Sequence, residues 1–118
     1  MITLSATFTL PIPPSANAIW RSNRGRTHLS AKYKSWIASA GLMLNSQRVP
    51  TINPPYQVEY AVGRPDKRRR DVTNFVKALD DLLQNCNVIT NDSEIIDSRI
   101  YWSADVEAGQ VRGTVRTA

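Results

Sequence analysis

The sequence has only one cysteine and one histidine among its 118 residues, and these shortages exclude several classes of protein. Cys86 cannot form a disulfide within the chain, and no Cys/His cluster has the spacing of a zinc site. His28 has no Ser or Cys motif beside it, so triad-type nucleophilic catalysis is not indicated. No apolar run is long enough to cross a membrane, and the N-terminus has no basic leader. We therefore expect a protein of the reducing cytoplasm.

Acidic residues are also fewer than basic ones, with 10 Asp and Glu against 15 Lys and Arg and a formal net charge of +5. A basic balance favours an anionic partner, most often nucleic acid. Five of the seven residues over 64–70, RPDKRRR, are basic, and a second basic loop carries Arg21, Arg24 and Arg26. Charge runs are commonly solvated loops, but this density favours phosphate binding. It does not distinguish DNA from RNA.

Apolar residues make up 42% of the chain, enough for a small core, and the length predicts one domain over 1–118. Because so small a core buries little surface, pairing with a second copy would add useful burial. Period-two alternation predicts strands over 2–10, 56–62, 95–103 and 111–117, and helical periodicity predicts helices over 31–47 and 72–85. This order predicts an α+β (mixed α/β) fold with two helices packed on a small mixed β-sheet.

Several local placements follow from the same patterns. Ile2 is expected on the inner face of the first strand, and Ile96 is expected to share one face with Ile100 and Trp102. Residues 15–28 are expected to form a polar loop, and residues 88–89 a short extended segment. Trp20, beside the basic loop, could stack on an exposed base, but a place in the core is the stronger expectation.

The helix over 72–85 is predicted to turn an apolar face to the core and a polar face outward, with Asp71, Asn74, Lys77, Ala78 and Asp81 on the polar side. Asp71 stands where an N-cap belongs, and a carboxylate there is stabilising. It can equally be a metal ligand, and the two roles are compatible. Lys77 is either a solvated lysine or a point charge near a scissile phosphate.

A second acidic segment, NDSEIID over 91–97, follows this helix. Mg²⁺ prefers hard oxygen ligands, usually one or two carboxylates with waters and substrate phosphate. Asp71 and Asp92 could supply these if the later turn folds back beside the helix.

Together these motifs resemble the RusA-type Holliday junction resolvases, small homodimeric DNA endonucleases of bacteria and their phages. The resemblance rests on RPDKRRRDVTNFVKALDDLL followed by VITNDSEIID, and on LPIPPSANAIWRSNRGRTHLS nearer the N-terminus, so it covers about residues 8–101. It implies a RusA-like homodimer in a bacterial cell or phage-infected host. It also implies a nuclease that depends on Mg²⁺, with Mn²⁺ as a possible substitute. The expected reaction is the nicking of two opposed strands of a four-way DNA junction in recombination and repair.

Carried over by position, the resemblance makes Asp71 and Asp92 the catalytic, metal-binding aspartates and Lys77 the catalytic lysine. Two positions depart from the family pattern, because Thr73 and Asn91 stand where aspartates are expected. A neutral oxygen binds Mg²⁺ more weakly than a carboxylate, so Thr73 would be a weak ligand, and nearby carboxylates could compensate. The expected DNA-binding residues are Arg64, Lys67, Arg68, Arg69, Arg70, Asn74, Arg21, Arg24 and Arg26.

Two other functions stay open, the first of them because of these departures. The chain could be a catalytically weak or inactive protein that binds branched DNA on the same fold. It could also be a nuclease for branched DNA other than the four-way junction.

Overall fold

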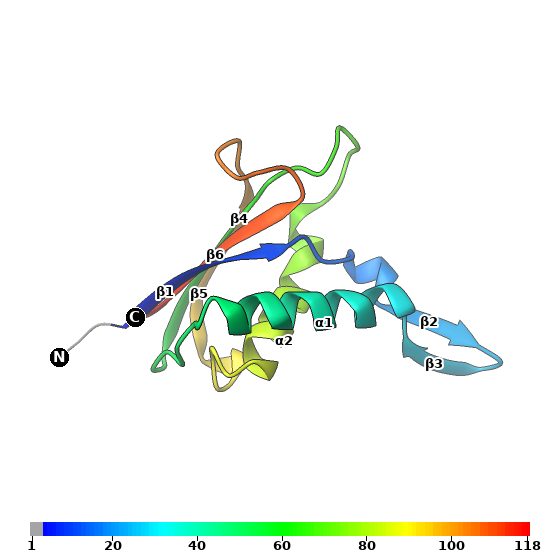
Figure 1. Cartoon of the computed structure of the whole chain (residues 1–118). Helices are drawn as coiled ribbons and strands as arrows, with labels where there is room; N and C mark the ends of the chain where they lie inside the picture. The colour runs from blue at the N-terminus through cyan, green and yellow to red at the C-terminus, as the bar shows by residue number, and fades with distance from the viewer. Residues whose placement is uncertain (1–3) are drawn as a thin grey trace.

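A computed structural model describes residues 4–118, apart from the side chains of residues 17 and 23, and Ile2 therefore lies outside the described residues. Four strands form one sheet: β1 (Ser5–Pro11), β4 (Tyr56–Val62), β5 (Ile95–Trp102) and β6 (Gln110–Thr117). Two helices, α1 (Ala31–Ser46) and α2 (Val76–Asn85), accompany the sheet, and a two-stranded hairpin projects from one end (Figure 1). The predicted α+β fold, with two helices and a mixed sheet, is confirmed.

The strand order is β1-β6-β4-β5. β6 runs antiparallel to both β1 and β4, while β4 and β5 are parallel. A parallel pair needs a crossover connection, and here that connection contains α2. The crossover therefore places α2 against the sheet, with the basic loop at its start and the later acidic turn at its end.

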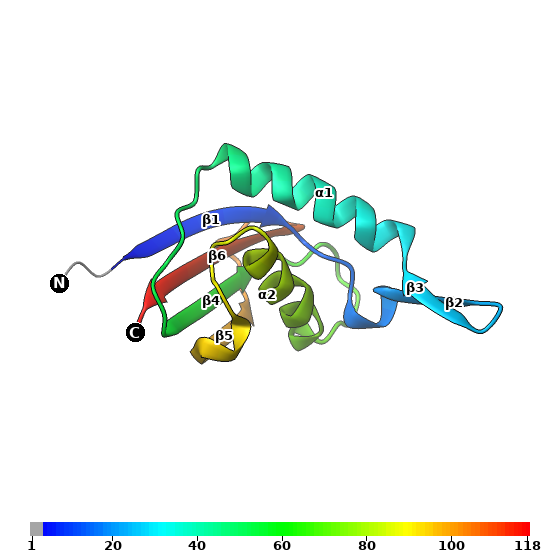
Figure 2. The same ribbon diagram turned by 90° about the horizontal axis from the view of Figure 1, so that it is seen from below.

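The core lies between the sheet and the helices. Tyr56, Val58, Tyr60 and Val62 alternate along β4 and are all buried, as the period-two pattern predicts. They share one hydrophobic cluster with residues of both helices, and α1 lies beside β1 and α2 (Figure 2). No helix within residues 4–118 is long and apolar enough to cross a membrane.

The start of α1 follows the sequence closely. The hydroxyl of Ser30 accepts a hydrogen bond from the Tyr33 N–H at 3.1 Å, which is the predicted N-cap. Tyr33, Trp36, Ala40 and Leu44 form the buried stripe. The indole of Trp36 also donates to the Pro11 carbonyl at 2.9 Å, which ties α1 to the end of β1.

The expected polar loop over 15–28 is wrong, because most of it is a hairpin. A short 3₁₀ turn, η1 (Ala16–Ala18), leads into β2 (Trp20–Asn23), which pairs antiparallel with β3 (Arg26–Leu29). The turn between them has positive φ at both central residues, Arg24 (52°) and Gly25 (78°). The type I′ two-residue hairpin turn needs this conformation, and an Arg-Gly pair is a weaker signal for it than Asn-Gly.

The placement of Ile96 is also wrong. Tyr56 pairs with Ile95 and Gln57 pairs with Asp97, so Ile96 is an extra residue in a β-bulge. Ile95 takes the inward position, whereas Ile96 is 65% exposed.

Three other details differ from expectation. Residues 88–89 form a buried bend after α2 rather than an extended segment. Ala78, expected on the polar face, is fully buried and belongs to the hydrophobic cluster. Trp20 is not in the core, since it is 57% exposed.

Candidate functional site

Asp71 caps the helical segment that the basic loop enters. That segment begins with a 3₁₀ turn, η2 (Val72–Phe75), and continues directly into α2. Asp71 Oδ1 accepts hydrogen bonds from the Thr73 N–H at 3.1 Å and from the Thr73 hydroxyl at 2.7 Å. These two bonds lower the pKa of the Asp71 carboxyl. The cap role is confirmed, and because both bonds end on Oδ1, Oδ2 is available to a further ligand.

Lys77 lies on the same helix and is held by an ion pair one turn further on. Its Nζ is 3.0 Å from Asp81 Oδ1, and this bond raises the pKa of Lys77. The Lys77 side chain is 68% exposed. Exposed pairs of this kind contribute little to stability, so Lys77 can leave Asp81 for a phosphate at small cost.

Asp92 lies beside the far half of α2, in the turn η3 (Asp92–Glu94) that precedes β5. Its N–H donates to Gln84 Oε1 at 2.9 Å, so the acidic turn is fastened to the helix. The charge of Asp92 contributes to raising the pKa of both Lys77 and Asp80, which places these three groups near one another. Asp71 stands six residues before Lys77, and the 3₁₀ turn η2 lies between them.

Asp80 is a carboxylate that the sequence analysis counted only among the neighbours that could compensate for Thr73 and Asn91. It is half-buried and accepts a hydrogen bond at 2.7 Å from the hydroxyl of Tyr60, a fully buried residue of β4. Burial raises the pKa of Asp80 to about 6; the Tyr60 hydrogen bond opposes this, while the charges of Asp92 and Asp81 add to it. The two partners are 20 residues apart in the chain, so only the topology brings them together.

Replacing Asp80 with Asn should stabilise the protein near neutral pH. The folded-state pKa, about 6, lies above the ordinary value of 3.8. The stability linked to this carboxyl is therefore present below about pH 4 and is lost as the pH rises through about 6. At pH 7.5 the wild type buries a charged carboxylate, whereas Asn is neutral and still accepts from Tyr60. After allowance for solvent screening, we expect Asp80→Asn to gain about 1–2 kcal/mol in free energy of unfolding.

Urea unfolding at pH 7.5 and at pH 4 measures this effect, and the gain should vanish at the lower pH. Asp105→Asn, at an exposed position outside the site, is the matched control and should show no such pH-dependent gain. Equal stability of Asp80→Asn and wild type at both pH values would contradict the burial of this charge.

Part of the positive charge of the basic loop is neutralised by Asp66, a residue of the same loop. Both terminal nitrogens of Arg70 donate to Asp66, with Nη2 3.0 Å from Oδ2, and these bonds lower the pKa of Asp66 to about 2. Arg64 stacks on the Trp102 ring, 4.4 Å from its centroid. The remaining cations of the loop, Lys67, Arg68 and Arg69, are exposed.

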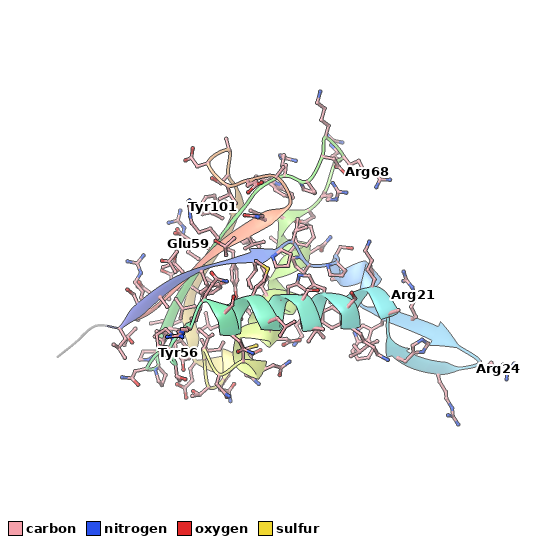
Figure 3. The ribbon with its side chains drawn as sticks, viewed as in Figure 1. Arg21, Arg24, Tyr56, Glu59, Arg68 and Tyr101 are labelled. Atoms are coloured by element: carbon pink, nitrogen blue, oxygen red, sulfur yellow. The ribbon has the colours of Figure 1, made fainter. Side chains whose placement is uncertain are left out.

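The two basic segments that the sequence predicted as DNA-binding project from different parts of the molecule. Arg68 projects from the loop between β4 and α2, whereas Arg21 and Arg24 project from the hairpin (Figure 3). Arg26 is exposed on the hairpin as well. The two segments are separate in space and could contact separate stretches of a long polyanion.

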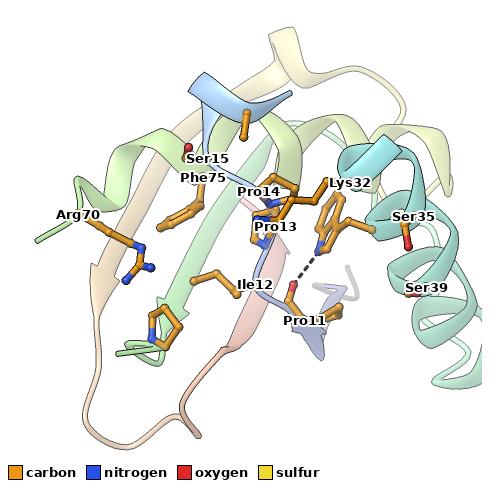
Figure 4. A pocket seen from close by; sticks show the side chains of 13 residues that line it. Pro11, Ile12, Pro13, Pro14, Ser15, Lys32, Ser35, Ser39, Arg70 and Phe75 are labelled. Atoms are coloured by element: carbon orange, nitrogen blue, oxygen red, sulfur yellow. Dashed lines mark hydrogen bonds between the residues drawn. The ribbon is translucent and has the colours of Figure 1, made fainter. Parts of the chain in front are cut away.

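A pocket of about 520 Å³ lies next to the basic loop, between the proline segment and α1 (Figure 4). Its walls are largely apolar and include Ile12, Pro13 and Phe75. Arg70 and Lys32 add positive charge to the lining. The pocket thus combines an apolar surface with two cations, of which Arg70 directly precedes Asp71 in the chain.

Comparison with known proteins identifies the family. Residues 11–116 match the protein family described as Endodeoxyribonuclease RusA. The chain belongs to the RusA family. The crossover junction endodeoxyribonuclease RusA of Escherichia coli (strain K12) is 32% identical over 108 residues, covering 91% of this chain and 90% of that protein. The proteins of the same name from Enterobacteria phage 82 and Shigella sonnei (strain Ss046) are each 31% identical over the same shares.

The RusA resemblance inferred from the motifs is therefore confirmed, and the chain is an enzyme of the endodeoxyribonuclease class. RusA-family nucleases are generally metal dependent. Within residues 4–118, no group of three or more His, Cys, Asp and Glu side chains is arranged to hold a metal ion. Mg²⁺ does not need such a group, because it usually takes one or two carboxylates and fills its octahedron with water and substrate oxygens. Asp71 has one carboxylate oxygen outside its hydrogen bonds to Thr73, and Asp92 is a half-buried carboxylate near Lys77 and Asp80.

Proposed function

We propose that this protein is a Mg²⁺-dependent endodeoxyribonuclease that resolves four-way DNA junctions by paired, symmetric nicking. The observation that carries the proposal is the RusA match over residues 11–116, together with relatives named crossover junction endodeoxyribonucleases. The local structure supports it, because an exposed basic loop leads directly into a capping aspartate with an open oxygen. Such an arrangement can draw a phosphate backbone toward a metal ligand.

Asp71 and Asp92 are proposed to hold the ion, with the Thr73 hydroxyl as a weak additional ligand. When bound, Mg²⁺ would supply an activated water and charge neutralisation at the phosphate. Mn²⁺ is a possible replacement, since both ions prefer oxygen ligands. The Thr73 hydroxyl donates a hydrogen bond to Asp71, so the lone pairs of the hydroxyl oxygen remain available to the ion.

Lys77 is proposed to exchange its ion pair with Asp81 for a phosphate oxygen. Its ammonium would then stabilise the negative charge that develops on the phosphate in the transition state. Asn74, in the same helical segment, is proposed to form a hydrogen bond with the neighbouring DNA backbone. The remaining contacts would come from the basic loop and the hairpin, through Arg64, Lys67, Arg68, Arg69, Arg70, Arg21, Arg24 and Arg26. DNA affinity should therefore fall steeply with salt.

We further propose that residues 1–118 act as one domain, and that two copies pair in the cytoplasm of a bacterial cell or phage-infected host. One hydrophobic cluster joins both helices to the sheet. Two copies related by a twofold axis would present one site to each of two opposed strands. The edge strand β5 carries the exposed Ile96, a surface that a second copy could cover.

Cleavage of labelled four-way junctions, forks and flaps in the presence of Mg²⁺ tests the substrate. We expect paired nicks in the four-way junction and much slower cutting of the other two. Faster cutting of forks or flaps would instead assign the chain to other branched DNA.

Thr73 favours one alternative, a DNA-binding protein that cuts weakly or not at all. The expected aspartate is missing at this position, and a hydroxyl binds Mg²⁺ less tightly than a carboxylate. In that case junction binding would persist without cleavage at any Mg²⁺ or Mn²⁺ concentration. Thr73→Asp would then create activity, whereas under the main proposal it only lowers the Mg²⁺ concentration needed for half-maximal cutting.

A further inference from the structure

A second cavity, of about 290 Å³, lies between the base of the hairpin, α1 and α2. Its lining divides by element. The hairpin and α1 supply an apolar side with Trp20, Leu29, Tyr33 and Ile37, and α2 supplies a polar side with Lys77, Asp81, Gln84 and Asn85. The cavity therefore opens directly onto the lysine proposed to act on the scissile phosphate.

Strand alternation turns Trp20 toward this cavity. Trp20 pairs with Leu29 and Arg21 pairs with His28, so the two apolar residues lie on one face of the hairpin and the two basic ones on the other. Trp20 and Leu29 both line the cavity, while Arg21 and His28 are exposed. A large aromatic surface that is 57% exposed, on a hairpin that also carries exposed arginines, is suited to stacking on a nucleobase.

The hydroxyl of Tyr33 is a further polar group of the same cavity. The residue is only 6% exposed, but its hydroxyl reaches solvent, because no buried polar side-chain atom within residues 4–118 lacks a hydrogen-bond partner. Burial and the charge of Asp81 raise the pKa of Tyr33, and Lys77 opposes this, so the hydroxyl lies near that ion pair. Gln84 uses its carbonyl oxygen on the Asp92 N–H, which leaves its amide nitrogen for a different acceptor.

We propose that this cavity receives one unstacked nucleobase from the branch point of the DNA, with Trp20 as the stacking platform. A nucleobase has two apolar faces and a polar edge, and the cavity has an apolar side and a polar side in matching positions. A sugar-phosphate backbone would leave the apolar side unused. The inference rests on the proposed junction cleavage and names the feature of the substrate that the site would recognise.

The cavity would also explain selectivity for branched DNA. Drawing a base out of a continuous duplex costs a few kcal/mol, and less where stacking is already interrupted. At a branch point the base can reach Trp20 while its neighbouring phosphate lies near Lys77. In an intact duplex the same contact would require the full unstacking cost. Trp20 is therefore a specificity-determining residue rather than a general DNA contact.

The test compares Trp20→Ala, Trp20→Phe and the control Leu42→Ala. Leu42 is another exposed large apolar residue, 71% exposed on α1, and does not line the cavity. Affinities for a four-way junction and for a matched duplex are measured in EDTA, where no cutting occurs. Stacking losses on alanine substitution predict roughly tenfold weaker junction binding by Trp20→Ala. Duplex binding should stay within about twofold of wild type, and Trp20→Phe and Leu42→Ala should bind the junction normally.

An abasic junction supplies the decisive comparison. The base at each branch-point position is removed in turn, and one removal should weaken wild-type binding by about the same factor as Trp20→Ala. Combining that removal with Trp20→Ala should then cost no more than either change alone, because both delete one contact. Additive losses would overturn the proposal, as would equal losses on duplex and junction. Analytical ultracentrifugation gives a further check. If Trp20→Ala no longer forms the dimers that the wild type forms, Trp20 belongs to a contact between copies and the proposal is overturned.

Junction cutting by the wild-type protein is recorded first. If the wild type binds and cuts junctions but Trp20→Ala behaves like wild type, the base pocket is wrong and the proposed function stands. If the wild type does not cut junctions, the proposed function fails independently of Trp20.

Discussion

Asp71→Asn is expected to lower the rate of junction cleavage by roughly a thousandfold or more while junction affinity stays within about twofold. A bound metal contributes several kcal/mol of charge stabilisation, and each 1.36 kcal/mol corresponds to a tenfold change in rate. Asn has the shape of Asp and still accepts from the Thr73 N–H, so the cap and the fold should survive. Asp92→Asn should act in the same way.

Single-turnover cleavage and binding in EDTA, measured on the same junction, separate these effects. Asp97→Asn provides a matched control, because Asp97 is an exposed carboxylate on β5. It removes one negative charge without touching the proposed ligands and should cut at the wild-type rate. Wild-type cleavage by both Asp71→Asn and Asp92→Asn would refute the site. Loss of junction binding in step with cleavage would instead make these residues structural.

Gly63→Ala is expected to destabilise the fold by about 3 kcal/mol or more. Gly63 follows β4 directly, where the basic loop begins. A Cβ there would lie 2.0 Å from the Glu107 carbonyl oxygen and 2.6 Å from the Val106 carbonyl oxygen. These are backbone atoms held by the turn before β6, since Gly63 donates to Gln110 and accepts from Gly109. The turn cannot move away without breaking those hydrogen bonds.

Gly41→Ala is the opposite case and serves as the control. Gly41 lies inside α1, and the nearest atom to an added Cβ is the Cys86 sulfur at 3.9 Å. Alanine in a helix interior is favoured over glycine by roughly 0.5–1 kcal/mol, so this variant should be more stable than wild type. Urea unfolding of both variants measures the difference. Similar changes for Gly63→Ala and Gly41→Ala would contradict the close packing of the turn.

The sequence predicted best the elements whose signals are local. The strand over 56–62 was predicted to the residue, because its inward residues alternate without interruption. The start of α1 was predicted because Ser30 is a direct capping signal. The hairpin was missed, since its Arg-Gly turn lacks the usual residues, and Ile96 was misplaced, since a bulge leaves no mark in the alternation.

The candidate site could be predicted only where its parts lie close in the sequence. Asp71 and Lys77 share one helical segment, so their placement followed from helical geometry and the family motif. The Tyr60–Asp80 hydrogen bond depends on how β4 and α2 pack, which no local pattern records. The Asp66–Arg70 ion pair was not predicted, because the sequence analysis treated residues 64–70 as a uniformly basic loop.

The most direct test of the central proposal uses a supercoiled plasmid that extrudes a cruciform, which is a four-way junction. A single nick relaxes the plasmid and reabsorbs the cruciform, leaving a nicked circle. Two nicks made across the junction before this happens leave a linear molecule. We predict linear product in the presence of Mg²⁺ and none with Asp71→Asn. Nicked circles without linear product, or equal cutting of a plasmid that lacks the cruciform, would contradict a paired junction resolvase.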